Sequence, residues 1–546
     1  MALGALFAVL GLVVHAPAFE GPFLSDDRYY IVANPAVRDP SPENLRRILD
    51  PMSDLTLIVA NWAPVHLLAH ALQWQLFGER VRGYHVTNAV AHAAASTLLV
   101  AVLAGAGVPH AAAALGGAFF LVHPANVEVV GWISQIKTLL AMVAMLAALL
   151  LRGRRPLLGS LAFALALLCK ALAAIALPVA LAMEWVRAPS AAGEAAGRRR
   201  LAYLAAWTGI FAVFAVVQFV AFRHAHQGVE PLVGDLDTRL WSSAAIGMRY
   251  LVMAATSLGV SAFHEPQPVT SPLDPWVLGA LAAGALLGAR TLVSLRRRRE
   301  EAVWWIWAAG SFAPVAQVFP FLYPMADRYL YFILPGLIGG VLLAGRSALA
   351  GLAPGRRRAA ARAAALLAAG ACAAFAVHAH ARAALWTADG RLLLDAALHY
   401  PEGPTAWYLR ARQAALEGDP ERAVAALRRA TPDLRRGVEG LLADDALARL
   451  RGAPAFEGFL REIAARSVAD FARFGRLTEA NLIKLAQAHL VLGDAEAARD
   501  ALERALALQG LYQPEIRGLL EQAEMLRRRP SGGPGAPRAA GAGPLR

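Results

Sequence analysis

The stretch LVHPANVEVVGWISQIK, residues 121–137, decides how this chain is interpreted. It places a histidine, a proline, a carboxylate, a serine and a lysine between two strongly apolar segments. Ionisable groups at the depth of a bilayer cost roughly 2.5–3.5 kcal/mol each on insertion scales, so their presence there is a functional hypothesis by default. We therefore interpret the rest of the chain in relation to this stretch.

The composition is that of a membrane protein. Of 546 residues, 57% are hydrophobic and only 17% are charged, and the mean hydropathy is +0.45. Soluble globular proteins have about 45–50% apolar and about 25% charged residues. The apolar excess lies in runs of roughly 15–25 residues, the length that spans a bilayer core. The sequence therefore predicts an all-α, multi-pass membrane protein.

The net charge of +13 reflects membrane topology rather than a nucleic-acid partner. The arginines cluster in short loops between apolar runs, at 152–155, 198–200, 296–299 and 356–358. Clusters of this kind mark the cytoplasmic side of the membrane. We expect no nucleic acid to bind.

Common metal, disulfide and nucleotide motifs are missing from the sequence. The two cysteines, Cys169 and Cys372, lie far apart in apolar runs and form no CxxC motif, so neither a zinc site nor a disulfide is expected. His66 and His70 share a helical face without the glutamate of an HExxH motif. No Walker loop or dinucleotide fingerprint occurs either. The sequence thus supports no metal site and leaves open whether a divalent metal assists.

The apolar runs predict eleven crossings. The first run, 2–19, lacks a basic n-region and is interpreted as a retained helix. A polar loop (20–60) and an interfacial amphipathic segment (61–77) follow it. The other predicted spans are 84–105, 110–123, 135–151, 156–170, 171–186, 201–222, 276–295, 302–322, 328–348 and 359–378. Segment 240–262 is interpreted as re-entrant or interfacial, because a crossing there would move the arginines of 296–299 outside.

With the N-terminus in the cytoplasm, counting crossings places four polar features on the outer face. They are the loop with Asp26, the stretch around His123, Lys170, and the pair Asp327–Arg328. One site can collect all four.

The composition changes after residue 383 to Ala, Leu, Arg and Glu with helical periodicity. Trp407, Ala411, Gly418, Ala423, Leu427 and Ala430 occupy the positions of a tetratricopeptide unit, and Leu482, Ala486, Gly493, Ala498, Leu502 and Ala505 repeat the spacing. Such small residues let paired helices pack closely. We predict three parts: a membrane domain (1–380), a helical repeat domain (383–526) and a disordered tail (527–546).

Several residues of the predicted membrane domain can carry chemistry. Asp26 and Asp27 can supply a general base and an orienting group, or form a solvated acidic loop or helix cap. Glu128 follows a helix-breaking proline and lines an enclosed cavity, or stabilises a helix start. Lys137 and Lys170, the only lysines before Lys484, can bind phosphate, or Lys137 can simply snorkel.

The Asp327–Arg328 pair has two interpretations. It is either a plain local ion pair or a place where Arg328 acts as a second phosphate clamp.

A resemblance covers about residues 20–340. The matching motifs, in order, are SDDRYYIVANP (25–35), NWAP (61–64) with LFG (76–78), GYHVTN (83–88) with His92, HP (123–124) with VE (127–128) and WIS (132–134), CK (169–170) with LP (177–178), and ADRY (326–329). On these motifs the chain resembles the bacterial transmembrane and tetratricopeptide-repeat O-mannosyltransferases of the GT-C superfamily of glycosyltransferases.

The resemblance implies a reaction and a location. It implies transfer of a sugar, typically mannose, from a polyprenyl-phosphate donor to a protein or glycan hydroxyl outside a bacterial inner membrane, with the repeats presenting the acceptor. It implies that Asp26 is the catalytic base and that Asp27 orients it. Lys137, Lys170 and Arg328 would hold the donor phosphate, and His85, His123, Glu128 and Asp327 would line the pocket.

The sequence departs from the family pattern at two places. Ala63 stands where relatives have the histidine of a Trp-His-Pro motif. Gln135, Ile136 and Thr138 stand where they carry a charged Glu, Arg and Asp around the lysine.

Two rival functions stay open. One is an oligosaccharide ligase or polymerase, which would use a diphosphate-linked donor. The other is a non-catalytic membrane scaffold whose repeats recruit partners. A transporter is disfavoured because no inverted repeat is evident.

Overall fold

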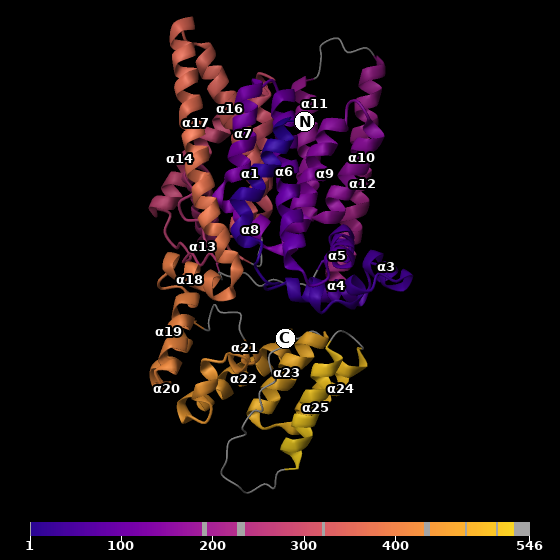
Figure 1. Cartoon of the computed structure of the whole chain (residues 1–546), viewed down its shortest axis with the longest axis vertical. Helices are drawn as coiled ribbons and strands as arrows, with labels where there is room; N and C mark the ends of the chain where they lie inside the picture. Colours follow the sequence, from indigo (N-terminus) through magenta and orange to yellow (C-terminus); the bar gives the residue numbers. More distant parts are fainter. Residues whose placement is uncertain are drawn as a thin grey trace. The chain divides into compact units, whose positions relative to one another are not determined.

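The computed structural model describes residues 2–59, 61–187, 194–225, 235–318, 323–430, 437–474, 478–508 and 512–528. Within these ranges every regular element is helical and none is a strand, which confirms the all-α prediction. The chain divides into two compact units, Met1–Asp395 and Ala396–Arg546 (Figure 1). The tail predicted to be disordered lies outside the described residues from 529 onward.

The first unit is built from α-helices. In chain order these begin with α1 (Ala2–His15), α2 (Pro35–Arg38), α3 (Pro42–Leu49), α4 (Asp54–Val59), α5 (Pro64–Phe77), α6 (Val81–Gly105), α7 (His110–Val122), α8 (Val127–Gly131) and α9 (Ile136–Leu151). They continue with α10 (Pro156–Cys169), α11 (Ala176–Arg187), α12 (Glu194–Ala225), α13 (Leu236–Thr256), α14 (Pro275–Arg296), α15 (Glu301–Phe312), α16 (Asp327–Ala350), α17 (Pro354–Ala383) and α18 (Asp389–His399), which ends just past the unit boundary. Short helices α3 to α5 lie at the lower end of the first unit in Figure 1.

Six helices of the described chain are long and apolar enough to cross a membrane: α6, α9, α12, α14, α16 and α17. The α7 and α8 helices, bent by 50° where they meet, make a seventh if they form one span. Helices α1 and α10 are apolar but shorter. The chain thus carries several candidate spans, whereas the eleven-span layout stays a prediction.

Backbone breaks explain why some expected spans are short. The runs 156–170 and 171–186 correspond to α10 and α11, which Lys170 separates with an extended backbone (φ −160°, ψ 126°), followed by the 3-10 turn Ala171–Ile175. The run 302–322 begins as α15, which ends at Phe312, and residues 319–322 lie outside the described ranges. Segment 240–262 falls on α13, which is not among the six long apolar helices.

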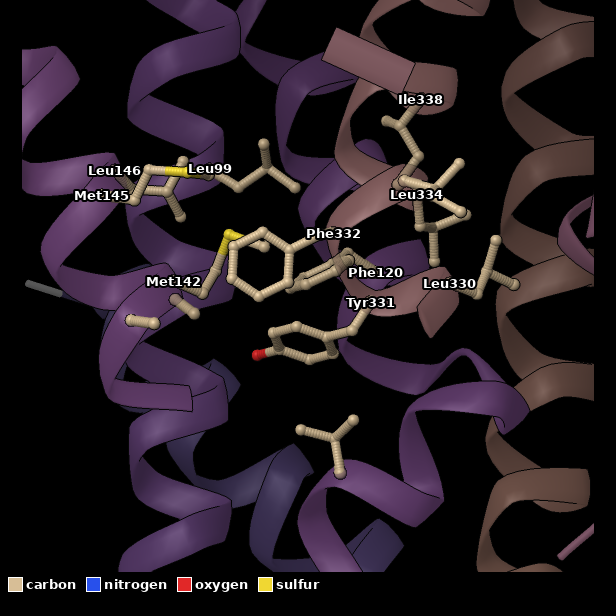
Figure 2. Close-up of a cluster of buried hydrophobic side chains, with 14 of the residues drawn as sticks. Leu99, Phe120, Met142, Met145, Leu146, Leu330, Tyr331, Phe332, Leu334 and Ile338 are labelled. Carbon is tan, nitrogen blue, oxygen red and sulfur yellow. The ribbon is translucent and has the colours of Figure 1, made fainter. Parts of the chain in front are cut away.

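The core of the first unit is formed where α6, α7, α9 and α16 meet. Figure 2 shows Leu99, Phe120, Met142 and Phe332 converging from these four helices. Glycines let α15 and α16 approach closely, because a Cβ built on Gly339 would lie 2.0 Å from the Trp304 ring. Helices in a membrane associate mainly through such close van der Waals contact.

The second unit consists of paired helices. They are α19 (Pro404–Leu416), α20 (Pro420–Ala430), α21 (Val438–Leu442), α22 (Pro454–Phe474), α23 (Glu479–Leu492), α24 (Ala495–Ala507) and α25 (Gln513–Arg527). Both predicted repeat copies are helix pairs, α19–α20 and α23–α24. Their linkers contain Gly418 (φ +79°) and Gly493 (φ +84°), in the left-handed region that favours glycine. The helical prediction is confirmed for this part, and its assignment to the tetratricopeptide class stays a prediction.

Candidate functional site

The stretch 121–137 breaks its helix twice. Helix α7 ends at Val122, His123 is extended before the turn Pro124–Asn126, and Trp132 is extended between α8 and the turn Ile133–Gln135. All residues from 121 to 136 are buried. Broken backbone at membrane depth is tolerated only inside protein, where its polar groups find partners.

Side chains from neighbouring turns supply those partners. The Asn88 amide donates to the carbonyl oxygens of residues 130, 132 and 133, at 3.1–3.3 Å. His92 Nε2 donates to the carbonyl of residue 121 at 3.0 Å, and Asn126 Nδ2 donates to that of residue 120 at 2.7 Å. The broken geometry is therefore fixed by hydrogen bonds, chiefly from α6.

Asp27 fastens the loop after α1 to this stretch. Its carboxylate accepts hydrogen bonds from the main-chain N–H of Leu24 at 2.9 Å, the main-chain N–H of Ser134 at 2.8 Å, and the Ser134 hydroxyl. The side chain is 1% exposed. Burial raises the pKa of Asp27 to about 7, although these hydrogen bonds oppose the shift. Asp27 is thus a positioning residue.

Asp26 is the more accessible carboxylate of the pair. It is half-buried and follows Ser25, whose φ is +49°. Among the residues that the structure describes, its carboxylate accepts a long contact of 3.5 Å from the Ser25 hydroxyl and no shorter side-chain bond. Its carbonyl accepts from the Tyr30 N–H at 2.9 Å, which begins the next helical turn. The backbone around Asp26 is therefore fixed while its carboxylate oxygens are left for another group.

Lys137 faces this loop from the start of α9. Its ammonium lies 4.6 Å from the centroid of the Tyr30 ring and 3.4 Å from the Tyr30 hydroxyl. It also lies within electrostatic range of Asp26, Asp27 and Arg328. The carboxylate of Asp26 and the ammonium of Lys137 thus lie in the same region of the fold, although their segments are more than 100 residues apart in sequence.

Lys170 reaches the same place from the break between α10 and α11. Its Nζ donates to the Thr138 hydroxyl at 2.7 Å, and Thr138 donates to Gln135 Oε1 at 2.7 Å. Lys170 interacts electrostatically with Lys137, Arg328 and Glu128. The neutral side chains of Gln135 and Thr138 therefore orient the lysine.

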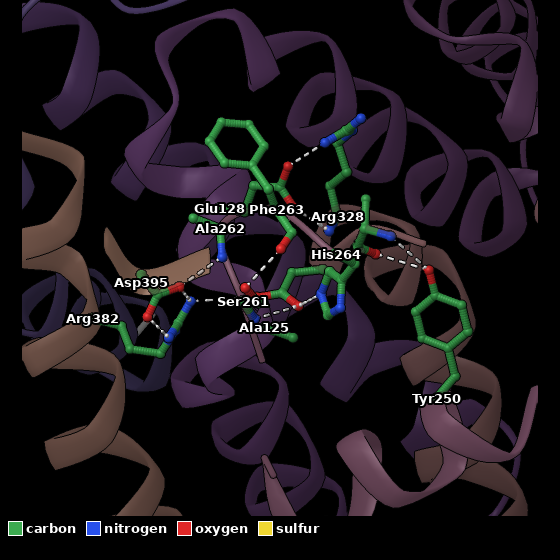
Figure 3. A network of polar contacts seen from close by, with 12 residues as sticks. Ala125, Glu128, Tyr250, Ser261, Ala262, Phe263, His264, Arg328, Arg382 and Asp395 are labelled. Atoms are coloured by element: carbon green, nitrogen blue, oxygen red, sulfur yellow. Dashed lines mark hydrogen bonds and ion pairs between the residues drawn. The ribbon is translucent and has the colours of Figure 1, made fainter. Parts of the chain in front are cut away.

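Glu128 and Arg328 form an ion pair across the site (Figure 3). Glu128 also accepts from the Arg328 main-chain N–H at 2.7 Å. The guanidinium lies 4.9–5.5 Å from the ring centroids of Trp132, Tyr323 and Tyr329. Much of the Arg328 charge is therefore already compensated by Glu128.

Asp327 belongs to a buried network beside that pair. It accepts from His264 at 2.7 Å and lies 3.8 Å from Arg382, which pairs with Asp395 at 3.1 Å. Figure 3 shows the Arg382–Asp395 pair approaching the segment of Ser261 to His264. These contacts tie together the start of α16, the end of α17 and the middle of α18.

The two predicted pocket histidines are held by main-chain groups. His123 Nδ1 accepts from the Ala125 N–H at 3.2 Å, so Nε2 carries the hydrogen that the carbonyl of Ala254 accepts at 3.2 Å. His85 Nε2 donates to the carbonyl of Gly21 at 3.0 Å. Both rings are nearly fully buried, at 0% and 1% exposure. Each fixes a backbone turn.

The predicted residues thus fall into two groups. One group forms a single charged cluster: Asp26, Asp27, Lys137, Lys170, Glu128 and Arg328. The other group holds the backbone around this charged cluster: His85, His123 and Asp327. The sequence interpretation did not single out Asn88 as a support, although an asparagine in an apolar run is itself a signal. His264, Arg382 and Asp395 were missed because nothing in the sequence connects them.

No metal-binding cluster of three or more His, Cys, Asp or Glu side chains occurs among the residues with described positions. Comparison with protein-family models, with curated proteins and with solved structures gives no match.

Proposed function

We propose that this chain is an integral-membrane glycosyltransferase that moves a sugar from a polyprenyl-phosphate donor to a hydroxyl of a protein or glycan. The sugar that we propose is mannose. The reaction takes place on the extracytoplasmic side of a bacterial inner membrane. The helical repeats of the second unit select the acceptor. The lipid-linked sugar is the donor substrate, and whether a divalent metal assists is open to direct test by adding a chelator to the transfer assay.

The observation that carries this proposal is the electrostatic interaction between the carboxylate of Asp26 and the ammonium of Lys137. A carboxylate with available oxygens lies within electrostatic range of an ammonium, and Lys170 and Arg328 lie near that ammonium. A sugar transfer from phosphate needs a base for the acceptor and cations for the departing phosphate. The candidate spans around the cluster suit a donor that is itself a lipid.

The roles follow from the contacts. Asp26 accepts the proton of the acceptor hydroxyl, and the hydroxyl oxygen forms a bond to the anomeric carbon with inversion. The bond from that carbon to the phosphate oxygen breaks, and the electron pair leaves with polyprenyl phosphate. Lys137 and Lys170 stabilise the negative charge that grows on the phosphate, and Asp27 keeps Asp26 in place.

The balance of charge favours a monophosphate donor over the diphosphate of a ligase or polymerase. Arg328 is paired with Glu128, and Lys137 faces the two aspartates. Lys170 has a neutral oxygen as its hydrogen-bond partner at Thr138. The cluster therefore offers little uncompensated positive charge for a second phosphate.

The test is sugar transfer by the purified full chain in liposomes, with radiolabelled polyprenyl-phosphate mannose. We expect Asp26→Asn to lower the rate by at least about 100-fold, in line with loss of a general base. Asp50→Asn, at an exposed aspartate that follows α3 in the same polar segment (20–60), is the matched control. Equal transfer by wild type and Asp26→Asn would contradict the proposal and favour a non-catalytic scaffold. Mass spectrometry of extracytoplasmic glycoproteins with and without the gene identifies the acceptor.

A further inference from the structure

Helix α5 carries a polar face that the proposed reaction does not yet use. His66, His70 and Gln73 occupy positions i, i+4 and i+7, which places them on one face. They are 1%, 0% and 4% exposed. The other face presents Leu72 and Leu76, which are 62% and 57% exposed. The polar residues of this helix are thus turned inward, where polar groups need partners.

Each of these three side chains has a buried atom without a hydrogen-bond partner among the described residues. The atoms are Nε2 of His66, Nε2 of His70 and Nε2 of Gln73. An unsatisfied buried polar group costs about 1–3 kcal/mol, and several together call for an explanation. The sequence placed His66 and His70 on one helical face but assigned them no metal-binding motif.

The polar face of α5 consists of uncharged groups. His70 Nδ1 lies 2.9 Å from Gln73 Oε1, a carbonyl oxygen that only accepts, so Nδ1 carries the hydrogen. In the neutral ring this leaves the Nε2 of His70 with a lone pair, while the amide nitrogen of Gln73 offers N–H groups. A ligand that both donates and accepts hydrogen bonds fits this face.

This face of α5 adjoins Lys137 and Lys170. The His66 ring packs edge-on against Tyr30 with centroids 4.8 Å apart, and the hydroxyl of Tyr30 contacts Lys137. The His70 ring packs edge-on against His66 at 4.6 Å. His66 also interacts electrostatically with Lys137 and Lys170.

Those lysines argue against a metal ion between the histidines, because they repel a cation. The described residues also provide no third His, Cys, Asp or Glu ligand there. A neutral ligand group rich in hydroxyls agrees with both facts. Such a group attached to a phosphate would place its charge at the lysines and its hydroxyls at α5.

We propose that His66, His70 and Gln73 form the subsite that binds the sugar hydroxyls of the lipid-linked donor. This inference rests on the proposed function and deepens it, because it names the residues that recognise the sugar rather than the phosphate. The lysines bind the part of the donor that all polyprenyl phosphates share. The α5 face binds the part that distinguishes one sugar from another.

The test compares two lipids on the purified full chain in nanodiscs: polyprenyl-phosphate mannose and sugar-free polyprenyl phosphate. The variants His66→Phe, His70→Phe and Gln73→Met keep most of the side-chain volume and remove the polar atoms. We expect about tenfold weaker binding of the mannose-bearing lipid, as for one lost hydrogen bond, and unchanged binding of the sugar-free lipid. Gln75→Met, on the exposed side of α5, is the matched control and should bind both lipids as wild type does.

A second measurement separates binding from folding. Without ligand, the thermal unfolding midpoint of His66→Phe should be unchanged or higher, because this variant removes a buried polar atom that lacks a partner. His70→Phe and Gln73→Met should lower the midpoint, because each also breaks the hydrogen bond between His70 and Gln73. If a phenylalanine variant does not fold, Gln73→Met alone decides.

Three outcomes overturn the inference. If wild type prefers the mannose-bearing lipid and the folded variants keep that preference, the subsite is wrong while the proposed function stands. If wild type binds neither lipid, both fail. If zinc ions stabilise wild type but not His66→Phe, the face is a cation site instead.

Discussion

The carboxylate of Asp27 accepts a hydrogen bond from the main-chain N–H of Ser134, 107 residues away, at 2.8 Å. This bond joins the loop after α1 to the broken stretch before α9. It holds the loop so that Asp26 lies within electrostatic range of Lys137, without a bond to Asp26 itself. The two adjacent aspartates therefore differ in environment, and their substitution should have different consequences.

Asp27→Asn should destabilise the first unit by about 1–3 kcal/mol, because the two carboxyl oxygens accept from the main-chain N–H groups of Leu24 and Ser134 and an asparagine NH₂ group cannot take the place of one of them. Asp26→Asn should change the stability by no more than about 0.5 kcal/mol. Unfolding in detergent near pH 5, where the Asp27 carboxyl is neutral, measures both. An equal effect of the two variants would contradict the division of roles.

The stability contributed by Asp27 should fall as the pH rises from about 4 to about 7. Burial raises its pKa to about 7 in the folded chain, whereas an unfolded aspartate has a pKa near 3.9. Between these values the folded state binds more protons than the unfolded state, so the free energy of unfolding decreases with pH. The difference in thermal midpoint between wild type and Asp27→Asn, followed from pH 4 to 8, checks this. A difference that grows with pH would refute it.

Thr138→Val should impair the donor site with little loss of fold. The valine keeps the shape but removes the oxygen that holds Lys170 Nζ at 2.7 Å. We expect about tenfold lower transfer from polyprenyl-phosphate mannose, and recovery in Thr138→Ser, which restores the hydroxyl. Activity in Thr138→Ser that is no better than in Thr138→Val would show that the hydroxyl is not what matters.

Asn88→Leu should be among the most destabilising single changes in α6. Its amide serves three carbonyl oxygens in the stretch before α9, and the residue is fully buried. Leaving these carbonyls without a donor should cost about 2–3 kcal/mol. Thr97→Val on the same helix is the control, because Thr97 only bonds back to the carbonyl of Ala93.

Gly493→Ala should destabilise the second unit by about 1 kcal/mol, because φ is +84° there and alanine disfavours the left-handed region. Gly458→Ala, within helix α22, should have the opposite sign or no effect. Urea unfolding of the full chain, followed by probes in the second unit, measures the difference.

The sequence predicted the helical class and the residues of the charged cluster, because costly polar residues stand out in apolar runs. It could not show that His85 and His123 hold backbone turns, since their partners lie 64 and 131 residues away. The His264–Asp327 contact was out of reach for the same reason. The boundary predicted between the runs 156–170 and 171–186 lies where the extended backbone of Lys170 separates α10 from α11. The 3-10 turn that follows Lys170 could not be predicted, because hydropathy does not report backbone conformation.

The dependence of the 121–137 stretch on α6 has a consequence for biosynthesis. In a chain inserted into a bilayer, the amide of Asn88 and the ring of His92 would have to be present before the broken backbone could leave water without losing its hydrogen bonds. Helix α6 precedes the stretch in the chain, so the ribosome delivers the donors first. The order of the helices along the chain is therefore also the order in which we expect them to insert. In a circular permutation that placed α6 after α9, we expect the broken stretch 121–137 to stay at the membrane surface.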